Sequence, residues 1–421
     1  MQTVQVIGLG YIGLPTAALL ATKGFSVIGV DTQANVVDNL NNGKIHLHEP
    51  GLDILLKSAL GSGNFLATTS PRCADIHIIC VPTPFKNNHE PDLSYIQSAI
   101  SSLAPILNNS DLVILESTSP VGTTLKVRSW LLELRPELNN VQFAYCPERV
   151  IPGKTVLELI ENDRVIGGIT TEATTRAADF YKCFVEGEVL LTTAKTAELC
   201  KLAENAYRDI NIAYANELSM VCDQFGINPY ELIKLTNHHP RVNILQPGPG
   251  VGGHCIAIDP WFIIDAAPKL TPLLQAGRTV NNKKPEWVVN KIKASAQLFD
   301  QPTILCLGLS YKANIDDLRE SPALSIAKQL TTLNIGDIIA CEPHINTCDT
   351  LKLFDLKAGL EQANIIVILV NHDAFTHINW PALSNAGKQI LDFTGITTNF
   401  SAAQNTRSPA FDHEGLKECE S

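Results

Sequence analysis

A cysteine directly after a run of glycines is the residue of this chain best suited to covalent chemistry. Cys255 follows Gly248-Pro249-Gly250-Val251-Gly252-Gly253-His254, and Asp259 lies four residues further on. Glycines allow a backbone to approach a ligand closely and can form an anion-binding nest. A helix that began near Cys255 would lower the pKa of the thiol and would place Asp259 on the same helix face. The alternative interpretation of Cys255 is a buried structural cysteine.

A second group of glycines has the spacing of a dinucleotide-binding turn. The sequence Gly8-Leu9-Gly10-Tyr11-Ile12-Gly13 follows a predicted strand and opens a predicted helix. The first glycine permits the tight turn, the second lets the backbone approach a pyrophosphate, and the third lets helix and strand pack closely. Asp31 ends the second predicted strand, where a ribose-binding acid is expected, and no arginine follows it. We therefore predict NAD rather than NADP.

Two further pairs of polar residues could assist a reaction or hold a substrate. Lys201 and Asn205 are four residues apart on one face of a predicted helix, and a cation with an amide can stabilise an oxyanion. Lys312 and Arg319 lie in a loop after a later predicted strand and are natural phosphate partners. Taken alone, the Lys201/Asn205 pair is better explained as part of a solvated helix with salt bridges. Surface charge on a loop is a serious alternative for Lys312 and for Arg319. The combination with a loop cysteine and a dinucleotide turn favours catalysis.

The elements that must position these residues alternate between strand and helix at both ends of the chain. Residues 197–225 contain neither proline nor glycine and predict one long helix that ends at Gly226. We expect an α/β protein with two doubly wound, parallel Rossmann-like domains joined by a central helical segment. The predicted strands cover residues 4–8, 27–31, 76–81, 112–116 and 142–146 in the first domain and 303–308, 337–341, 365–370 and 389–393 in the last.

Short polar segments follow several of these predicted strands. Pro82-Thr83-Pro84 and Glu116-Ser117-Thr118 fall at the carboxyl ends of strands, where open α/β sheets bind ligands, although ordinary turns would explain both. In the last domain, Ser321-Pro322 has the pattern of an N-cap followed by proline at the first helical position. That domain lacks the three-glycine turn and is better suited to a mononucleotide diphosphate than to a second dinucleotide.

Composition excludes several functional classes. The chain has 45% hydrophobic and 18% charged residues, which is typical of a globular protein, and its net charge of −11 argues against nucleic-acid binding. Eleven cysteines without a CxxC indicate a reducing compartment. We expect no signal peptide and no membrane insertion, and hence a cytoplasmic protein. The histidine pairs His46/His48 and His238/His239 match no zinc spacing, so we expect no metal.

Seven motifs occur in order along nearly the whole chain. They are GLGYIGLP from Gly8, PTP at Pro82, ESTSPVGTT from Glu116, CPER at Cys146, ELCKLAENAYRD from Glu198, GVGGHCIAIDP from Gly250 and GLSYKANIDDLRESP from Gly308. In these motifs the chain resembles the UDP-glucose/GDP-mannose dehydrogenase family. The resemblance implies an NAD-binding domain over residues 1–195, a central helical dimerisation segment with the catalytic loop over 196–298, and a UDP-sugar-binding domain over 299–421. It also implies a homodimer formed through the long helix.

The resemblance assigns a role to each matching residue. Cys255 is the expected nucleophile, Lys201 and Asn205 the oxyanion stabilisers, Asp259 an assistant in proton transfer, Glu148 an assistant in thioester hydrolysis, and Thr118 a neighbour of the reacting C6. The expected cofactor-binding residues are Gly8, Gly10, Tyr11, Ile12, Gly13, Asp31, Thr83, Thr118 and Arg319. The expected substrate-binding residues are Glu148, Arg149, Lys201, Asn205, Arg208, Arg241, Asn243, Gly252 and Lys312.

The reaction implied is the four-electron oxidation of a sugar C6 alcohol to a carboxylate through a cysteine thiohemiacetal and thioester. The stretch HPRVNILQPGPGVGGHCIAIDPWF resembles the family members that act on UDP-N-acetyl-D-mannosamine and supply bacterial surface polysaccharides. UDP-glucose members usually have Ser or Ala before the cysteine and Lys before the aspartate, where this chain has His254 and Ile258. UDP-N-acetyl-D-glucosamine and, less favoured, UDP-glucose are the alternative substrates.

Overall fold

The computed structural model describes residues 2–47, 49–86, 89–151, 153–253 and 255–397. The chain divides into two compact units, the first comprising Met1–Ala206 and Ile258–Thr271, the second Tyr207–Ala257 and Pro272–Ser421. The first unit is therefore discontinuous in sequence. Among the described residues, none of the helices combines the length and the apolar character needed to cross a membrane.

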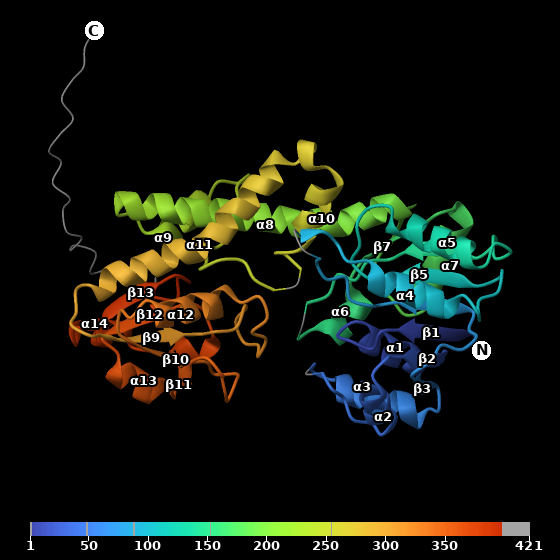
Figure 1. The fold of residues 1–421 in the computed structure, drawn as a ribbon, viewed down its shortest axis with the longest axis horizontal. Coiled ribbons are helices and arrows are strands. Elements are labelled where there is room, and N and C mark those ends of the chain that lie inside the picture. The colour runs from blue at the N-terminus through green and yellow to red at the C-terminus, as the bar shows by residue number, and fades with distance from the viewer. Residues whose placement is uncertain (1, 48, 87–88, 152, 254, 398–421) are drawn as a thin grey trace, which may run out of the picture. The chain divides into compact units, whose positions relative to one another are not determined.

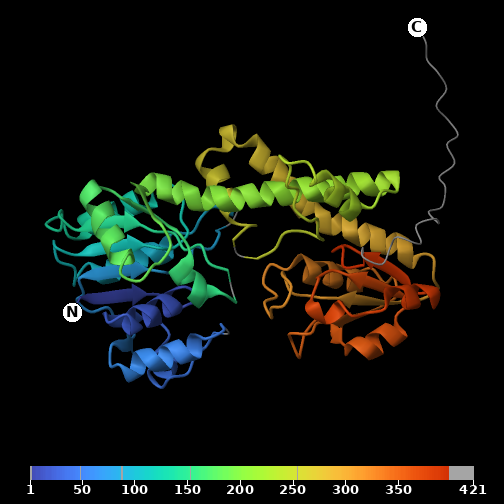
Figure 2. The same ribbon diagram turned by 180° about the vertical axis from the view of Figure 1, so that it is seen from behind.

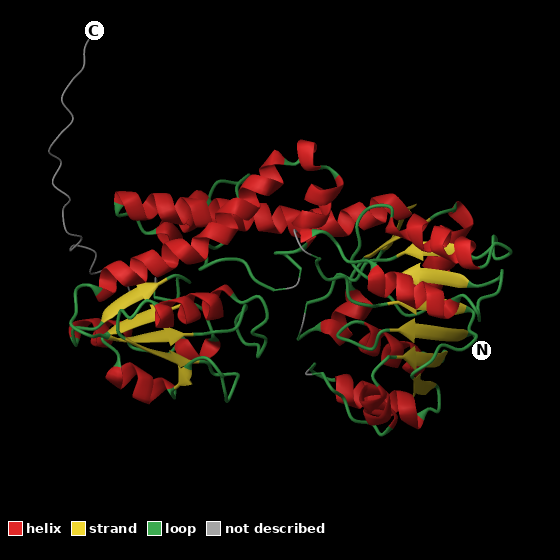
Figure 3. Cartoon of the chain, viewed as in Figure 1, coloured by secondary structure: helices red, strands yellow, loops and turns green. Residues whose placement is uncertain are grey.

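A mainly parallel sheet forms the centre of the first unit (Figure 1; Figure 3). Its strands are β1 (Thr3–Ile7), β2 (Ser26–Val30), β3 (Phe65–Thr68), β4 (Ile76–Ile79), β5 (Leu112–Leu115), β6 (Gln142–Tyr145), β7 (Arg164–Gly168) and β8 (Val189–Thr193). They lie in the order β3-β2-β1-β4-β5-β6-β7-β8. The chain reverses direction in the order beside β1, which creates the switch point at which doubly wound sheets bind ligands.

The expectation of a wholly parallel sheet is wrong at one place. β6 and β7 pair antiparallel, through Ala144 with Gly168 and Tyr145 with Gly167. β7, β8 and β3 were also absent from the predicted strands. Polar residues or glycines occupy part of each of these strands, and the side chains of β8 are only partly buried or exposed, so they lack the continuous apolar run that marks a central parallel strand.

Helices cover both faces of this sheet and bury its apolar side chains. One face packs against α1 (Gly13–Thr22), α2 (Ala34–Asn41), α3 (Leu52–Gly61), α6 (Thr155–Glu161) and α7 (Thr171–Tyr181). The other packs against α4 (Ser94–Leu103), α5 (Thr123–Leu134) and the first turn of α8 (Ala194–Phe225). β4 and β5 are buried on both faces, which explains why their sequences are unbroken runs of mostly apolar residues.

The second unit contains a five-stranded, fully parallel sheet (Figure 2). Its order is β11-β10-β9-β12-β13, with the strands β9 (Thr303–Leu307), β10 (Asp337–Cys341), β11 (Lys352–Leu353), β12 (Ile365–Ile368) and β13 (Gln389–Asp392). The helices α11 (Pro272–Ala296) and α12 (Pro322–Thr332) pack on one face. The helices α13 (Leu356–Gln362) and α14 (Trp380–Asn385) pack on the other, and α9 (Pro229–Thr236) packs beside α8.

Two local predictions are confirmed. The long helix α8 spans 32 residues and ends before Gly226, whose φ of +65° lies in the left-handed region that favours glycine. Ser321 caps α12 by accepting a hydrogen bond from the Leu324 N–H, with Pro322 at the first helical position. A side-chain oxygen at the N-cap and proline at the next position suit the unpaired N–H groups of a helix start.

Glu198 fixes the beginning of α8 to the first unit. Its buried carboxylate accepts hydrogen bonds from the Gly122 N–H at 2.5 Å and from the Thr124 N–H and hydroxyl at 2.7 and 2.6 Å. These donors lie at the N-terminus of α5, where backbone N–H groups have no partner within the helix and the helix dipole favours an anion. Glu198 is thus a helix cap contributed by a distant part of the chain.

We predict that Glu198→Ala lowers the free energy of unfolding by about 3 kcal/mol, because it leaves buried donors at the α5 N-terminus without an acceptor. Chemical denaturation followed by circular dichroism measures the change. Glu217→Ala is the matched control, since Glu217 is an exposed glutamate on the same helix. Equal stability of the two variants would contradict this account of Glu198.

Candidate active site

The glycines of the dinucleotide turn lie where the backbone is crowded. A Cβ on Gly8, whose φ is +89°, would stand 2.6 Å from the Cys80 carbonyl oxygen, and a Cβ on Gly13 would stand 1.8 Å from the Gly8 carbonyl oxygen. A Cβ on Gly10 would meet no protein atom within 4 Å. Gly8 and Gly13 are therefore required by the close packing of β1, β4 and α1. At Gly10 the protein leaves space for a ligand to approach, which fits NAD.

Asp31 lies directly after β2 and faces this turn. Its carboxylate accepts hydrogen bonds from the Leu9 N–H at 3.1 Å and the Gln33 N–H at 3.0 Å. These two bonds hold the carboxylate beside the glycine turn while the residue stays partly exposed. Tyr11 is exposed and Ile12 partly exposed at the start of α1. The geometry places an acid at the position from which it can bind a ribose hydroxyl.

The segments after β4 and β5 are joined to each other. The Thr83 hydroxyl donates to the Thr118 carbonyl oxygen at 2.6 Å, and the Ser117 hydroxyl donates to the Val81 carbonyl oxygen at 2.7 Å. Both threonines are partly exposed. The two segments that were predicted at strand ends therefore form one continuous rim at the carboxyl ends of β4 and β5, where open α/β sheets bind ligands.

The buried carboxylate of Glu116 lies directly after β5, next to these two segments. Glu116 accepts hydrogen bonds from the Tyr181 hydroxyl at 2.5 Å and from the Cys80 thiol at 3.1 Å. Burial raises the pKa of Glu116, and the charge of buried Arg164 opposes that rise. These contacts could not be predicted from the sequence, because Glu116, Cys80 and Tyr181 come from three separate elements and no spacing connects them.

Four polar residues form a mostly buried cluster in the first unit. The Asn205 amide donates to the Asp259 carboxylate at 2.6 Å, and the Lys201 ammonium lies 3.9 Å from the Glu148 carboxylate. Lys201, Asn205 and Asp259 are all less than a tenth exposed. Lys201 and Asn205 share a face of α8, Asp259 opens α10 (Asp259–Ala266), and Glu148 follows β6. The resemblance assigned Lys201 and Asn205 to oxyanion stabilisation, Asp259 to proton transfer and Glu148 to thioester hydrolysis.

Burial determines the charge state of this cluster. It raises the pKa of Asp259 to about 6, although the charge of Lys201 and the hydrogen bond from Asn205 act in the opposite direction. A carboxyl group with such a pKa can exchange a proton near neutral pH. The nearby ammonium and amide can stabilise a developing oxyanion in a site of low dielectric. Strongly shifted pKa values of this kind gather at active sites.

Two arginines expected to bind substrate lie close to this cluster in the sequence. Arg149 forms an ion pair with Glu204 at 2.8 Å and donates to the Asp163 carbonyl oxygen at 3.0 Å. Arg208 is exposed on α8. Two acidic residues of α8 therefore have structural partners. Glu204 pairs with Arg149, and Glu198 caps α5.

The glycine loop before Cys255 belongs to the second unit and is tightly packed there. A Cβ on Gly252 would lie 2.3 Å from the Glu320 carbonyl oxygen, and one on Gly253, with φ of +81°, would lie 2.8 Å from the Tyr311 ring. The Asn216 side chain accepts a hydrogen bond from the Gly248 N–H at 2.9 Å. The loop thus packs against the segment that carries Lys312, a contact between two motifs that the sequence analysis treated separately.

The expectation of a helix beginning near Cys255 is wrong. Residues 255–258 form turns, and α10 begins at Asp259, with Pro260 near its start. Proline lacks an N–H and is tolerated in the first turn of a helix but not in its interior, so Pro260 favours a helix that begins at Asp259 and not at Cys255. Cys255 is exposed, and Asp259 does not share a helical face with it.

The remaining predicted residues lie on the surface of the second unit. Lys312 is exposed, and exposed Arg319 forms a bidentate ion pair with Asp317, with its closest N–O distance 2.6 Å. Arg241 and Asn243 are exposed in the segment after α9. The Asn237 side chain holds that segment by hydrogen bonds to the Ile244 N–H and carbonyl at 2.7 and 2.9 Å.

The Rossmann sheet, its glycine turn and the buried cluster define an NAD-dependent dehydrogenase. Comparison with known proteins gives the family. The chain matches the UDP-glucose/GDP-mannose dehydrogenase family in its NAD binding domain over residues 2–185, its central domain over 195–283 and its UDP binding domain over 305–399. The chain belongs to this family and is an NAD-dependent UDP-sugar 6-dehydrogenase.

Individual relatives cover nearly the whole chain. A Ralstonia nicotianae protein named NDP-N-acetyl-D-galactosaminuronic acid dehydrogenase is 49% identical, with 94% of this chain and 96% of that protein aligned. A Yersinia pestis protein named UDP-N-acetyl-D-mannosamine dehydrogenase is 50% identical, with 90% and 95% aligned. The solved structure of a UDP-D-ManNAc dehydrogenase from Pyrococcus horikoshii has a TM-score of 0.85 at 36% identity and covers 94% of this chain and 96% of its own.

We predict that Asp259 makes stability depend on pH. Its pKa is raised from the ordinary 3.8 to about 6, so the folded state binds the proton more tightly than the unfolded state. The free energy of unfolding should fall by about 3 kcal/mol as the pH rises from ~3 to ~7, and Asp259→Asn should remove that part of the decline. Urea denaturation at several pH values measures it, with exposed Asp38→Asn as the control. Parallel pH profiles of wild type and Asp259→Asn would contradict the raised pKa.

Proposed function

We propose that the protein oxidises the C6 alcohol of UDP-N-acetyl-D-mannosamine to the carboxylate of UDP-N-acetyl-D-mannosaminuronate. The observation that carries this proposal is the buried set of Lys201, Asn205 and Asp259 in the same unit as the dinucleotide turn. A cation, an amide and a carboxyl group able to exchange a proton meet the needs of alcohol oxidation and of acyl hydrolysis. The chain's similarity to a Yersinia pestis protein named for this sugar supports the choice of substrate.

We assign the chemical steps to the residues as follows. NAD, bound at the Gly8–Gly13 turn, supplies a two-electron acceptor and is used in two successive rounds. Asp259, acting through water, takes the proton of the C6 hydroxyl in the first oxidation, which produces an aldehyde. The Cys255 thiolate adds to the aldehyde carbon and forms a thiohemiacetal, and Lys201 with Asn205 stabilises its oxyanion. Loss of a second hydride gives a thioester.

Hydrolysis completes the cycle. Glu148 takes a proton from a water molecule as the water adds to the thioester carbon, and the carbon–sulfur bond breaks to release Cys255 as the thiolate. The carboxylic acid formed loses its remaining proton to solvent and leaves as the carboxylate product. Lys312 binds the substrate, Arg319 serves the cofactor, and Arg149, Arg208, Arg241, Asn243 and Gly252 contribute to substrate binding.

In this proposal the residues 1–195, 196–298 and 299–421 serve as the NAD-binding, central dimerisation and UDP-sugar-binding parts of a cytoplasmic enzyme. The product is a precursor of bacterial surface polysaccharide.

A second substrate has a specific observation in its favour. The similar Ralstonia nicotianae protein is named for an N-acetyl-D-galactosaminuronic acid. The two amino sugars differ in the configuration of ring carbons and share the C6 alcohol, so the chemistry assigned to Cys255 is the same for both. A substrate panel separates them.

We propose that the enzyme is a homodimer formed through α8. Three exposed apolar side chains, Tyr207, Tyr214 and Val221, recur every seven residues and therefore lie along one face of the helix, and exposed Phe225 extends the row. Tyr207 is 65% exposed and Phe225 69% exposed, which is unusual for large apolar side chains on an isolated surface. A second copy of this helix would cover them.

We predict two NADH per molecule of limiting UDP-N-acetyl-D-mannosamine at completion, because the conversion of an alcohol to an acid removes four electrons. Absorbance at the NADH band measures the yield, with UDP-N-acetyl-D-glucosamine, UDP-N-acetyl-D-galactosamine and UDP-glucose in parallel. Cys255→Ser should stop at the aldehyde and yield one, whereas Cys183→Ser, a change of an exposed cysteine on the NAD-binding unit, should keep two. Two NADH from Cys255→Ser would refute covalent catalysis, and two NADH only from another sugar would replace the substrate.

We predict that Tyr214→Lys converts the dimer to a monomer, because a charge in the middle of a buried apolar row is costly to desolvate. Sedimentation velocity measures the mass. Tyr95→Lys, at an exposed tyrosine on α4, should leave the dimer intact. A wild-type monomer, or a Tyr214→Lys dimer of unchanged affinity, would show that α8 does not form the interface.

A further inference from the structure

The second sheet repeats the geometry of the dinucleotide turn with a different residue at its centre. Gly308 follows β9 and donates its N–H to the Cys341 carbonyl oxygen, as Gly8 after β1 donates to the Val30 carbonyl oxygen. Leu309 donates its N–H to Glu342 at 2.7 Å, as Leu9 does to Asp31 at 3.1 Å. Glu342 is thus the counterpart of Asp31, the acid at the end of the second strand.

Glu342 differs from Asp31 because it is buried and because its carboxylate oxygens already accept hydrogen bonds from several groups of the protein. It accepts hydrogen bonds from the N–H groups of Leu309, Ser310 and His344 and lies 3.1 Å from Nε2 of His372. Burial would raise the pKa of this carboxyl, but the hydrogen bonds from His372 and the backbone outweigh it and lower the pKa. Glu342 is therefore a charged internal anchor and is not available to a ribose hydroxyl.

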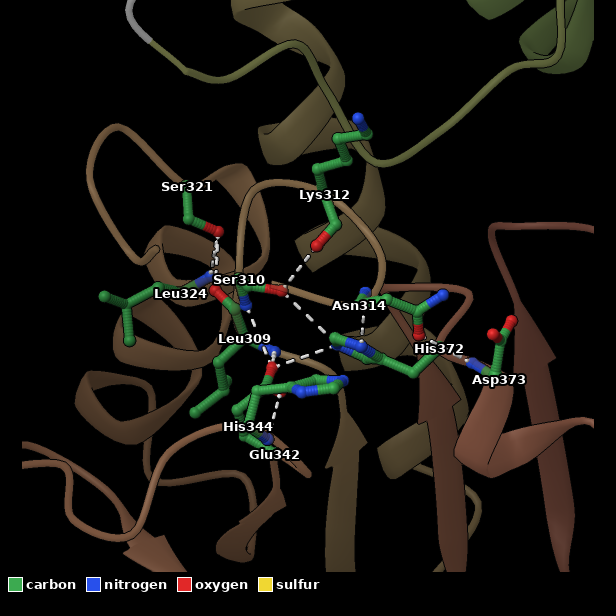
Figure 4. A network of polar contacts seen from close by, with 10 residues as sticks. All are labelled: Leu309, Ser310, Lys312, Asn314, Ser321, Leu324, Glu342, His344, His372 and Asp373. Atoms are coloured by element: carbon green, nitrogen blue, oxygen red, sulfur yellow. Dashed lines mark hydrogen bonds and ion pairs between the residues drawn. The ribbon is translucent and has the colours of Figure 1, made fainter. Parts of the chain in front are cut away.

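His372 has one tautomer that satisfies its contacts. Its Nδ1 lies 3.0 Å from the Asn314 backbone nitrogen, which can only donate, so Nδ1 must accept. Nε2 then carries the proton in the neutral ring and donates toward Glu342, with the Ser310 hydroxyl oxygen 3.3 Å away. Figure 4 shows the imidazole between Glu342 on one side and Asn314 on the other.

These contacts fix the backbone on both sides of Lys312. The Ser310 hydroxyl donates to the Lys312 carbonyl oxygen at 2.8 Å. Two residues after Lys312, Asn314 donates its N–H to His372 and accepts the Asp373 N–H at 3.0 Å, and its φ of +62° places it in the left-handed region. Figure 4 shows the Lys312 side chain extending away from this network.

We propose that His372, whose Nε2 donates to Glu342, is a positioning residue that presents Lys312 to the diphosphate of the UDP-sugar. The inference rests on the proposed function, because it supplies the means by which that substrate is held. An exposed lysine has a long, flexible side chain, so a ligand must order it on binding. A backbone already fixed at Ser310 and Asn314 reduces that ordering cost, which is the general advantage of preorganisation. Since Glu342 is occupied, the second sheet holds its nucleotide through cations and backbone groups.

The test measures UDP and NAD binding separately by isothermal titration calorimetry. His372→Asn keeps an acceptor for the Asn314 N–H but removes the donor to Glu342. His372→Gln keeps a donor to Glu342 but removes the acceptor for the Asn314 N–H. Each should raise the Kd for UDP about tenfold and leave the Kd for NAD within about twofold, because only the Lys312 segment loses its support. His377→Gln, at an exposed histidine on the same unit, should change neither Kd.

A double-mutant cycle with Lys312→Ala distinguishes positioning from a general loss of structure. If His372 acts through Lys312, His372→Asn should cause no further loss of UDP affinity in the Lys312→Ala protein. Ser310→Ala provides a milder variant, since it removes only the hydroxyl that joins Lys312 to the network, and it should raise the Kd for UDP severalfold if the histidine variants fold poorly.

The outcomes are separable. An unchanged Kd for UDP in His372→Asn, His372→Gln and Ser310→Ala, or an equal loss with and without Lys312, would overturn the positioning role while leaving the proposed function intact. Wild-type protein that binds NAD but no UDP would overturn the proposed substrate class and this inference together. A loss specific to UDP that vanishes in the Lys312→Ala background would support it.

Discussion

The hydrogen bond between Asn205 and Asp259 is the contact on which the proposed chemistry depends. It joins residues 54 positions apart and brings the first residue of α10 against the polar face of α8. Buried carboxyl groups are costly unless polar partners surround them. Burial raises the pKa of the Asp259 carboxyl to about 6, and Asn205 and the charge of Lys201 provide the polar partners that oppose this rise. The same few atoms therefore set the protonation of Asp259 in the folded protein and the proton transfer that we propose for it.

The two sheets use the same architectural feature for different purposes. In both, an acid after the second strand accepts a backbone N–H from the turn after the first strand. Asp31 stays partly exposed and has capacity for a ligand, whereas Glu342 is closed off by backbone donors and His372. One fold thus produces a dinucleotide site when the turn contains glycines and the acid faces outward. It produces a buried hydrogen-bond network that fixes the turn when Ser310 replaces the second glycine and the acid is buried.

Much of this organisation could be predicted from the sequence. Apolar runs such as residues 112–115 mark buried strands, an uninterrupted segment marks α8, and Ser321-Pro322 marks the start of α12, because each depends on local preferences. What could not be predicted depends on distant partners. The antiparallel pairing of β6 with β7, the capping of α5 by Glu198 and the late start of α10 after Cys255 follow from tertiary packing. The Glu342–His372 pair carries no spacing signal, since 30 residues separate its members.

The discontinuity of the first unit has a consequence for the order of biosynthesis. Residues 1–206 contain the whole eight-stranded sheet and the glycine turn, but the segment 258–271 that completes the unit is made later. At ~5–20 residues per second, translation of residues 207–271 takes roughly 3–13 s. During that interval the nascent chain can form its NAD turn while the polar face of α8 still awaits Asp259. The glycine turn and Asp31 are thus made before the carboxyl group to which we assign proton transfer.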